Sequence, residues 1–360
     1  MLKRRLGRTN FEASVVGFGG IPIRRQPKEE AVRVVRRAIE LGVNFIDTAR
    51  SYGDSEDKIG EAIRGIREGL FISTKSHFRT NREVKNSIEE SLRRLAIDKI
   101  DLMFIHGVDS DEELEYRLKM GVLEVMKEAR EAGKVDYIGI SGHRNDVLTR
   151  AIRTGAFDAI IATYNLTNYD GDRELFPLAR ELDVGVIVMK PLGGGYLAVP
   201  PEAVQFKVAD RATNTAEASL KFALSNPYVT TVIPGMGTIE EVEEDVPVGY
   251  VHQRMPLEEI EELQERAKEV GFTFCEGCGY CWPLCPKGIA IQDVFRLLVF
   301  HEQYGMKEWA ETVYREDHEA LVVGCDECES CMEVCPAQLD IPAKLREAAA
   351  ILGSKQGCHE

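Results

Sequence analysis

The stretch "LFISTKSHFRTNREVKNSIEESLRRLAIDKIDLMFIHG", residues 70–107, contains the repeating unit that decides the fold. It begins and ends with short apolar runs, 70–75 and 101–107, which have the length and composition of buried strands. Between them, residues 81–96 place apolar side chains three and four positions apart, which is the spacing of an amphipathic helix. A strand, a helix and a second strand in this order predict two parallel strands joined by a crossover helix.

The same alternation continues along the chain up to about residue 245. The predicted strands are 14–19, 44–49, 70–75, 101–107, 137–142, 159–165, 184–190 and 229–235. The last helix of the series is "IEEVEEDV". Eight strand–helix units favour a (β/α)8 TIM barrel. A doubly wound open sheet is the alternative, but "GFGGIP", after the first strand, lacks the spacing of a dinucleotide-binding G-x-G-x-x-G motif.

Cysteine is confined to the C-terminal part of the chain. Two copies of the pattern C-x2-C-x2-C-x3-C-P, at 275–286 and 325–336, contain all but one of the nine cysteines. Thiolates at this spacing hold [4Fe–4S] clusters, and in two-cluster proteins the fourth cysteine binds the other cluster. Zinc is the alternative, but paired C-x2-C sites leave the third cysteine and the proline unexplained.

The predicted cluster ligands therefore cross between the two motifs. One set is Cys275, Cys278, Cys281 and Cys335, and the other is Cys325, Cys328, Cys331 and Cys285. The remaining cysteine, Cys358 in "GCHE", has no partner pattern.

The positions of these patterns predict the domain organisation. Residues 1–255 form the barrel, 256–270 a charged linking helix, 271–345 the two-cluster domain and 346–360 a C-terminal tail. The segment between the two cysteine motifs has helical patterns, so we expect a small, mainly α-helical, dicluster ferredoxin-like domain.

Net charge and hydropathy exclude some classes of partner. A net charge of −15 argues against nucleic acid and against an anionic membrane surface. No apolar run reaches the length of a membrane span, and no apolar signal region follows the basic N-terminus. The sequence predicts a cytoplasmic protein.

Four polar residues stand at or just after the ends of the second, third and fourth predicted strands, where TIM barrels carry their active sites. They are Asp47, Tyr52, Lys75 and His106. A tyrosine is a reluctant acid at neutral pH, and a neighbouring ammonium lowers its pKa. A histidine can hydrogen-bond a carbonyl and orient it, so this set suggests proton transfer to a carbonyl oxygen, with a nicotinamide supplying the hydride.

Residues 1–250 resemble the aldo-keto reductases. The resemblance rests on the four residues above and on the motifs "NFIDTARSYGDSEDKIGEAI", "GISGH", "MKPLGGG" and "VIPGMGTIEEVEED". It implies that Tyr52 is the general acid, that Lys75 and Asp47 tune it, and that His106 orients the substrate. It also implies binding of NADP or NAD through Ser141, Lys190, Pro191, Leu192, Gly193, Gly194, Gly195, Gly235, Glu241, Glu244 and Asp245. Ser141 corresponds to the carboxamide-binding serine, the loop from Pro191 to Gly195 to the pyrophosphate contact, and Glu244 and Asp245 to positions near the adenine.

Several positions depart from the family pattern. The asparagine that usually follows the carboxamide-binding serine is Gly142 here, and a common glutamine is Ile161. The aromatic residue that often stacks on the nicotinamide is Met189. The lysine and arginine that commonly bind the 2′-phosphate are Gly235 and Glu241, which weakens the case for NADP because a phosphate needs charge-assisted donors. The resemblance still favours NADP slightly, and NAD remains open.

The whole chain resembles the aldo-keto reductase branch that carries a C-terminal dicluster domain. One difference is that three residues separate Cys281 from Cys285, where the first motif of that branch often has two. The implied function is reduction of a small aldehyde or ketone, or oxidation of an alcohol. The clusters would be structural, regulatory or a contact with a redox partner protein. Two alternatives are an electron-transfer protein whose clusters feed a flavin or partner at the barrel, and a redox-sensing or binding protein with an inactive barrel.

Overall fold

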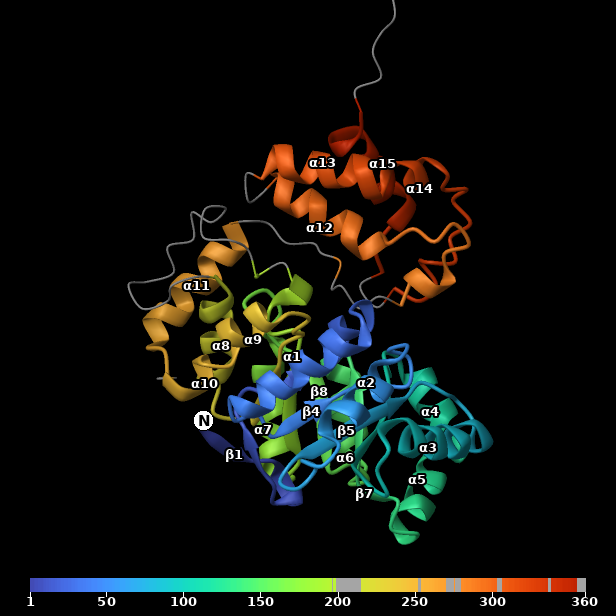
Figure 1. The fold of residues 1–360 in the computed structure, drawn as a ribbon, viewed down its shortest axis with the longest axis vertical. Coiled ribbons are helices and arrows are strands. Elements are labelled where there is room, and N and C mark those ends of the chain that lie inside the picture. Colours follow the sequence, from blue (N-terminus) through green and yellow to red (C-terminus); the bar gives the residue numbers. More distant parts are fainter. Residues whose placement is uncertain are drawn as a thin grey trace, which may run out of the picture. The chain divides into compact units, whose positions relative to one another are not determined.

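The computed structural model describes residues 1–195, 197–198, 215–251, 254–269, 275, 280–302, 306–335 and 338–354. Cys278 and Cys358, two of the cysteines considered above, lie outside the described residues. The chain divides into two compact units (Figure 1). One contains Met1–Pro191 and Ser219–Leu257, and the other contains Leu192–Ala218 and Glu258–Glu360.

The first unit is built on one sheet of eight parallel strands, in the order in which they occur along the chain. They are β3 (Phe18–Gly19), β4 (Phe45–Asp47), β5 (Phe71–Ser76), β6 (Ile100–Ile105), β7 (Val135–Gly142), β8 (Ala159–Thr163), β9 (Gly185–Met189) and β10 (Thr231–Ile233). Parallel bridges from Val16 to Val232 and from Gly19 to Gly235 join the first strand to the last. This closure confirms the predicted barrel and excludes the open sheet.

Helices follow the strands and surround the barrel (Figure 1). They are α1 (Lys28–Glu40), α2 (Ser55–Ile63), α3 (Asn81–Leu95), α4 (Asp111–Lys119), α5 (Val122–Glu131), α6 (Asn145–Arg153), α7 (Leu175–Glu181), α8 (Thr215–Ser225), α9 (Ile239–Asp245) and α10 (Val248–Val251). A short 3-10 helix, η2 (Pro22–Arg25), precedes α1. The β6–α5 connection contains α4, a helix beyond the regular series, which begins where the Ser110 side chain accepts a hydrogen bond from the amide of Glu113.

An antiparallel hairpin at the N-terminus closes the end of the barrel opposite to the strand C-termini. Its strands are β1 (Lys3–Arg5) and β2 (Glu12–Ser14). Leu6 and Ala13 from this hairpin pack in one buried cluster with Phe45 and Phe71, which begin β4 and β5. The hairpin was not predicted, because its strands are short and polar and show no apolar run. Ser14 belongs to this hairpin, so the first barrel strand is shorter than the predicted 14–19.

The second unit contains helices joined by irregular segments, and no strand, in its described part. Its helices are α11 (Leu257–Glu269), η6 (Trp282–Leu284), α12 (Ile291–Glu302), α13 (Lys307–Asp317), α14 (Glu319–Val323) and α15 (Ile341–Leu352). Helix α12 packs against α13 and α15, and apolar residues such as Val294, Leu298 and Leu345 form a common core. The expected mainly α-helical, ferredoxin-like domain is confirmed.

Candidate active site and cysteine pocket

The four candidate catalytic residues gather where β4, β5 and β6 end. Asp47 is the last residue of β4, and Lys75 lies near the end of β5. His106 follows β6, and its amide continues the β5–β6 pairing by donating to the carbonyl of Ser76 over 2.9 Å. Tyr52 stands on the loop between β4 and α2. The barrel therefore places all four side chains at one rim.

Asp47 and Lys75 form a buried ion pair at the centre of this group. Lys75 Nζ donates to Asp47 Oδ2 and, over 2.7 Å, to the carbonyl of Thr48. Ser73 Oγ donates to the other carboxylate oxygen over 2.6 Å. Both side chains of the ion pair are only 3% exposed. Burial is the largest single influence on the pKa of Lys75 and lowers it, but Asp47 and Tyr52 together outweigh burial. The pKa therefore lies above its usual value, and the ammonium persists at neutral pH.

Tyr52 contacts this ion pair through Lys75, whose Nζ lies 5.1 Å from the centre of the phenol ring. Burial raises the pKa of Tyr52 above its usual value, while the charge of Lys75 lowers it. The lowering by the ammonium agrees with the sequence argument, but the net direction is upward because burial is the larger effect. The phenol therefore holds its proton at neutral pH, as a general acid must.

His106 packs edge-on against Tyr52, with ring centres 5.8 Å apart and an interplanar angle of 81°. Its Nδ1 lies 3.4 Å from Ser51 Oγ. Burial, together with the nearby charge of Lys75, lowers the pKa of His106 well below its usual value. The imidazole is therefore neutral at physiological pH and can act as a hydrogen-bonding group.

Two features of this rim were not found from the sequence. Arg117 on α4 is buried and donates to the main-chain carbonyl of His106 over 2.8 Å. Asp109 accepts a hydrogen bond from the amide of His143 over 2.5 Å, and its other oxygen lies 3.1 Å from His143 Nδ1. The role of Arg117 could not be predicted, because α4 is an extra helix outside the regular strand–helix series. The aspartate and histidine in "HGVDS" and "GISGH" were visible, but their pairing depends on the β6–β7 neighbourhood.

Ser141, the candidate carboxamide-binding residue, is the second-last residue of β7, and its hydroxyl makes two hydrogen bonds. It donates to the carbonyl of Ile105 over 3.3 Å and accepts from the amide of Gly107 over 3.1 Å. One acceptor position remains on Oγ, which fits an N–H donor of a carboxamide. At Gly142 a Cβ atom would lie 2.4 Å from the carbonyl oxygen of Val108, so this chain has no room for the family's asparagine.

The other candidate cofactor residues are divided between the two units. Lys190 and Pro191 follow β9 in the barrel unit, and Lys190 adopts a left-handed conformation with φ of 55°. Leu192 to Gly195 belong to the second unit, where the three glycines of this loop have φ values of 58°, 72° and 104°. Such values favour glycine, which explains the "GGG" sequence.

The remaining candidate residues lie at both ends of α9: Gly235 and Glu241 near its start, and Glu244 and Asp245 at its end. Glu241 Oε2 accepts from the amides of Gly237 over 2.6 Å and Thr238 over 3.2 Å, completing a capping box. At Gly235 a Cβ atom would lie 2.8 Å from Pro22 Cγ in η2, so a longer side chain does not fit this backbone. Asp245 is buried and Glu244 is exposed. Burial raises the pKa of Asp245 well above its usual value, and Glu244 and Glu241 add to the effect.

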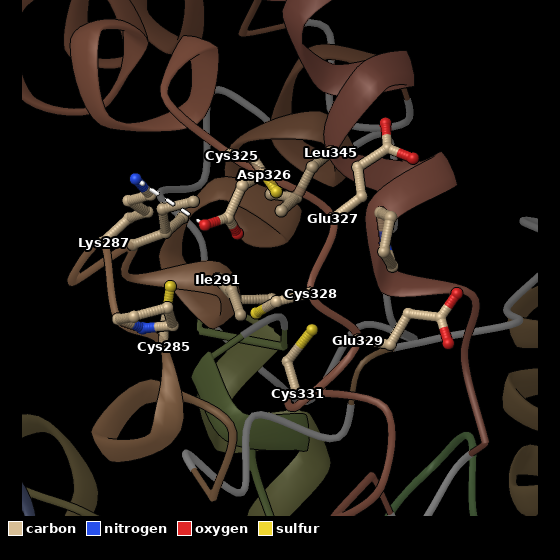
Figure 2. A pocket seen from close by; sticks show the side chains of 13 residues that line it. Cys285, Lys287, Ile291, Cys325, Asp326, Glu327, Cys328, Glu329, Cys331 and Leu345 are labelled. Carbon is tan, nitrogen blue, oxygen red and sulfur yellow. Dashed lines mark ion pairs between the residues drawn. The ribbon is translucent and has the colours of Figure 1, made fainter.

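In the second unit, one pocket brings cysteines of the two motifs together. Figure 2 shows Cys285 of the first motif lining this pocket with three cysteines of the second motif, Cys325, Cys328 and Cys331. The ion pair between Lys287 and Asp326, with Nζ and Oδ2 3.6 Å apart, lies at its edge. This grouping is the predicted second ligand set.

The members of the other predicted set lie against the helical core. Cys281 is buried there, and Cys275 and Cys335 pack beside it and are partly exposed. The fourth member, Cys278, lies outside the described residues.

In the described part of the chain, no helix combines the length and the apolar character needed to cross a membrane.

Both parts of the chain match known protein families. Residues 15–268 match the Aldo/keto reductase family, and residues 274–340 match the 4Fe-4S dicluster domain. An uncharacterized oxidoreductase of Bacillus subtilis, YqkF, is 27% identical over 75% of this chain and 97% of its own length. An L-galactose dehydrogenase of Arabidopsis thaliana is 29% identical over 68% of this chain and 86% of its own length.

Solved structures agree with these relatives. The holo form of the aldo-keto reductase AKR11C1 from Bacillus halodurans superposes with a TM-score of 0.65 at 27% identity, covering 74% of this chain and 96% of its own. An aldo/keto reductase from Klebsiella pneumoniae, solved in complex with NADP and acetate, shares the fold with a TM-score of 0.63 at 22% identity, covering 74% of this chain and 95% of its own. The chain therefore belongs to the aldo-keto reductase family, and to the branch of it that carries a C-terminal 4Fe-4S dicluster domain.

Proposed function

We propose that this oxidoreductase reduces a small aldehyde or ketone to an alcohol, or runs the reverse reaction, with Tyr52 as the general acid. The observation that carries the proposal is the position of Lys75. Its buried ammonium is held by Asp47 and lies 5.1 Å from the Tyr52 ring centre. A phenol beside a fixed cation can give up its proton, because the cation stabilises the phenolate that remains.

In this mechanism, the Tyr52 hydroxyl donates its proton to the carbonyl oxygen of the substrate. Asp47, whose carboxylate also accepts a hydrogen bond from Ser73, holds the ammonium of Lys75 in place, so that it is directed at the phenol when charge develops there. His106, kept neutral by burial, donates a hydrogen bond that orients the carbonyl. A bound nicotinamide cofactor supplies the hydride.

The residues around the rim fit a nicotinamide cofactor in part. The remaining acceptor position of Ser141 Oγ suits the carboxamide N–H. Family resemblance assigns Lys190 and the Pro191–Gly195 loop to the pyrophosphate, and Glu244 and Asp245 to the adenine end. The carboxylate of Glu241, bonded to the amides at the start of α9, would repel a 2′-phosphate there, so we propose that NAD(H) is accepted at least as well as NADP(H).

We further propose that residues 271–345 hold two [4Fe–4S] clusters with crossed ligands. The pocket that Cys285 shares with Cys325, Cys328 and Cys331 supports the second set. The crossed arrangement ties the two motifs into one unit, so the clusters contribute at least to the folding of this domain.

Replacing Tyr52 with phenylalanine tests the assigned acid. General acids typically contribute about 10²- to 10⁴-fold to the rate, so Tyr52→Phe should lower kcat by that factor. The assay is reduction of a panel of aldehydes and ketones, beginning with 4-nitrobenzaldehyde, by NADH and by NADPH under anaerobic conditions.

The matched control is Tyr137→Phe, which removes a hydroxyl that donates to the carbonyl of Thr9 at the hairpin end of the barrel. It should keep wild-type activity, and both variants should keep their iron. A Tyr52→Phe enzyme with wild-type kcat would refute the role of the phenol. A wild-type protein that reduces no member of the panel would refute the proposed function.

A further inference from the structure

Tyr52 stands on the loop of residues 48–54, so its position depends on the contacts that hold this loop. Two main-chain hydrogen bonds extend the β4–β5 pairing beyond Asp47. The amide of Thr48 donates to the carbonyl of Ser73 over 2.9 Å, and the amide of Arg50 donates to the carbonyl of Lys75 over 3.0 Å. The first residues of the loop therefore run beside β5, the strand that carries Lys75.

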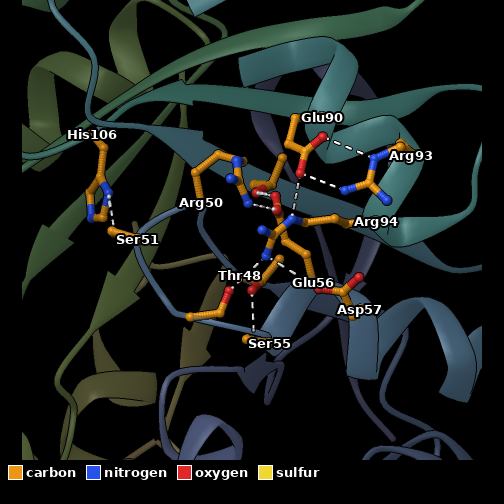
Figure 3. A network of polar contacts seen from close by, with 12 residues as sticks. Thr48, Arg50, Ser51, Ser55, Glu56, Asp57, Glu90, Arg93, Arg94 and His106 are labelled. Carbon is orange, nitrogen blue, oxygen red and sulfur yellow. Dashed lines mark hydrogen bonds and ion pairs between the residues drawn. The ribbon is translucent and has the colours of Figure 1, made fainter. Parts of the chain in front are cut away.

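A fully buried carboxylate reinforces this connection. The side chain of Glu56, in the first turn of α2, is 0% exposed. One of its oxygens accepts from Arg50 Nη1 over 2.7 Å (Figure 3). The other accepts from Thr74 Oγ1 over 2.7 Å. Glu56 thus connects the loop residue two positions before Tyr52 to the strand residue next to Lys75. Arg50, Glu56 and Thr74 together are called the Glu56 clamp below.

We propose that Glu56 is a positioning residue for catalysis, which sets the separation between the Tyr52 phenol and the Lys75 ammonium. The inference rests on the proposed function, in which Tyr52 is the acid. Glu56 itself acts only through the loop and the strand that it joins.

The alternation of side chains along β5 explains why the clamp can do this. Successive residues of a strand point to opposite faces, so Thr74 faces the helices while Ser73 and Lys75 face the barrel interior. Inside the barrel, Asp47 fixes the ammonium of Lys75. On the outer side, Glu56 fixes the neighbouring residue Thr74. Strand β5 is therefore held on both of its faces at Thr74 and Lys75.

Other contacts hold the loop to different elements. Thr48 Oγ1 donates to Ser55 Oγ over 2.9 Å, and Ser55 Oγ donates to the carbonyl of Gly20, the residue after β3, over 2.8 Å. On the other side, Arg94 of α3 donates to the carbonyl of Gly53 over 3.0 Å. These contacts orient the loop relative to β3 and α3, whereas the clamp sets it relative to β5.

The physical chemistry of a buried carboxylate makes the clamp sensitive to change. A buried charge is tolerated only when it is paired and hydrogen-bonded, so loss of one partner forces the others to rearrange. A displacement of about 1 Å of a catalytic group can cost about 10²-fold in rate. A rearranged clamp should therefore be visible in kcat even where the protein still folds.

The test uses the full-length protein, prepared anaerobically, with 4-nitrobenzaldehyde as the probe. Glu56→Gln and Thr74→Val should each lower kcat about tenfold or more, with little change in the KM of the aldehyde or the cofactor. Thr74→Ser keeps the hydroxyl and should restore kcat. The matched control is Glu61→Gln on the same helix, which removes surface ion pairs with Arg64 and Lys28 and should leave kcat unchanged.

Separate outcomes decide the inference and the proposed function. The inference is overturned if Glu56→Gln and Thr74→Val fold and keep wild-type kcat, or if Glu61→Gln lowers kcat as much as they do. If Glu56→Gln does not fold, the comparison of Thr74→Val with Thr74→Ser decides. A wild-type protein that reduces no carbonyl compound contradicts the proposed function alone. Crystal structures then decide the inference, because the 5.1 Å between Lys75 Nζ and the Tyr52 ring centre should change in Thr74→Val and stay unchanged in Thr74→Ser.

Discussion

The barrel rim and the cysteine domain fix their functional groups by different means. At the rim, side chains hold side chains: Asp47 holds Lys75, and Lys75 in turn faces Tyr52. In the cysteine domain, the backbone directs the thiols. Glu327 and Glu329, between the cysteines of the second motif, have left-handed φ values of 54° and 61°. Residue identity reveals the ligands of both sites, but the geometry of the second site depends more on backbone conformation.

The two cysteine motifs differ in the residue types at these positions. Because their spacing is identical, Glu327 and Glu329 correspond to Gly277 and Gly279, which lie outside the described residues. After the last cysteine, Gln338 with φ of 50° corresponds to Gly288 with φ of 68°. Glycine is the residue that adopts such conformations at little cost. One motif thus carries glycine at the three positions where the other carries a strained residue.

The largest expected effect tests the crossed ligand sets. Two [4Fe–4S] clusters give about eight iron atoms per chain. Cys285→Ala combined with Cys325→Ala removes two ligands of one predicted cluster, so about four iron atoms should remain. Cys285→Ala combined with Cys275→Ala removes one ligand from each cluster and should leave little iron. Iron analysis and EPR of anaerobically purified, reduced protein measure both results.

Uncrossed ligation would reverse these two results, because Cys285 and Cys275 would then belong to one cluster. Cys358→Ala is the control, since Cys358 stands outside both motifs and should not change the iron content. A colourless preparation that contains zinc would contradict the clusters altogether.

A smaller effect is expected at the barrel, where one side chain should decide between cofactors. Glu241→Arg replaces the carboxylate at the start of α9 with a cation. A hydrogen bond to a charged group contributes roughly 1.5–3 kcal/mol, so the affinity for NADPH relative to NADH should rise about tenfold or more. Fluorescence titration of the nucleotides measures the two dissociation constants directly.

Glu240→Arg is the matched control for this change. Glu240 is exposed and adjacent, and replacing it makes the same change in net charge. An equal gain in NADPH affinity from both variants would show that the general charge near α9, rather than the position of Glu241, governs the choice of cofactor.

The same contrast explains what could be predicted from the sequence. The eight strands and the rim residues follow from apolar runs and from polar residues at strand ends, since a barrel brings strand ends together. The Glu56 clamp could not be predicted, because nothing in the sequence shows that Glu56 turns inward rather than toward solvent. The capping role of Glu241 could not be predicted either, because it depends on the conformation of the turn before α9. The N-terminal hairpin could not be predicted because it is stabilised by packing against the barrel that it closes.

The smallest expected effect concerns the left-handed positions, and it tests whether the backbone directs the cysteine domain. At Gly288 no atom lies within 4 Å of an added Cβ, so Gly288→Ala changes only the backbone preference. A left-handed conformation costs a non-glycine residue roughly 1–2 kcal/mol, so this variant should destabilise the domain by about that amount. Gln338→Gly removes the same cost, but glycine gives the unfolded chain more freedom, so a gain of at most about 1 kcal/mol is expected.

The two tryptophans, Trp282 and Trp309, both lie in the second unit, so their fluorescence reports on this domain during thermal unfolding. A change of 1 kcal/mol shifts the midpoint of a small domain by about 4–8 °C. The midpoint should fall for Gly288→Ala and rise for Gln338→Gly at a fixed heating rate. If the two variants shift the midpoint in the same direction, the two motifs do not share one backbone conformation. The claim that backbone conformation directs the thiols of the cysteine domain is then contradicted.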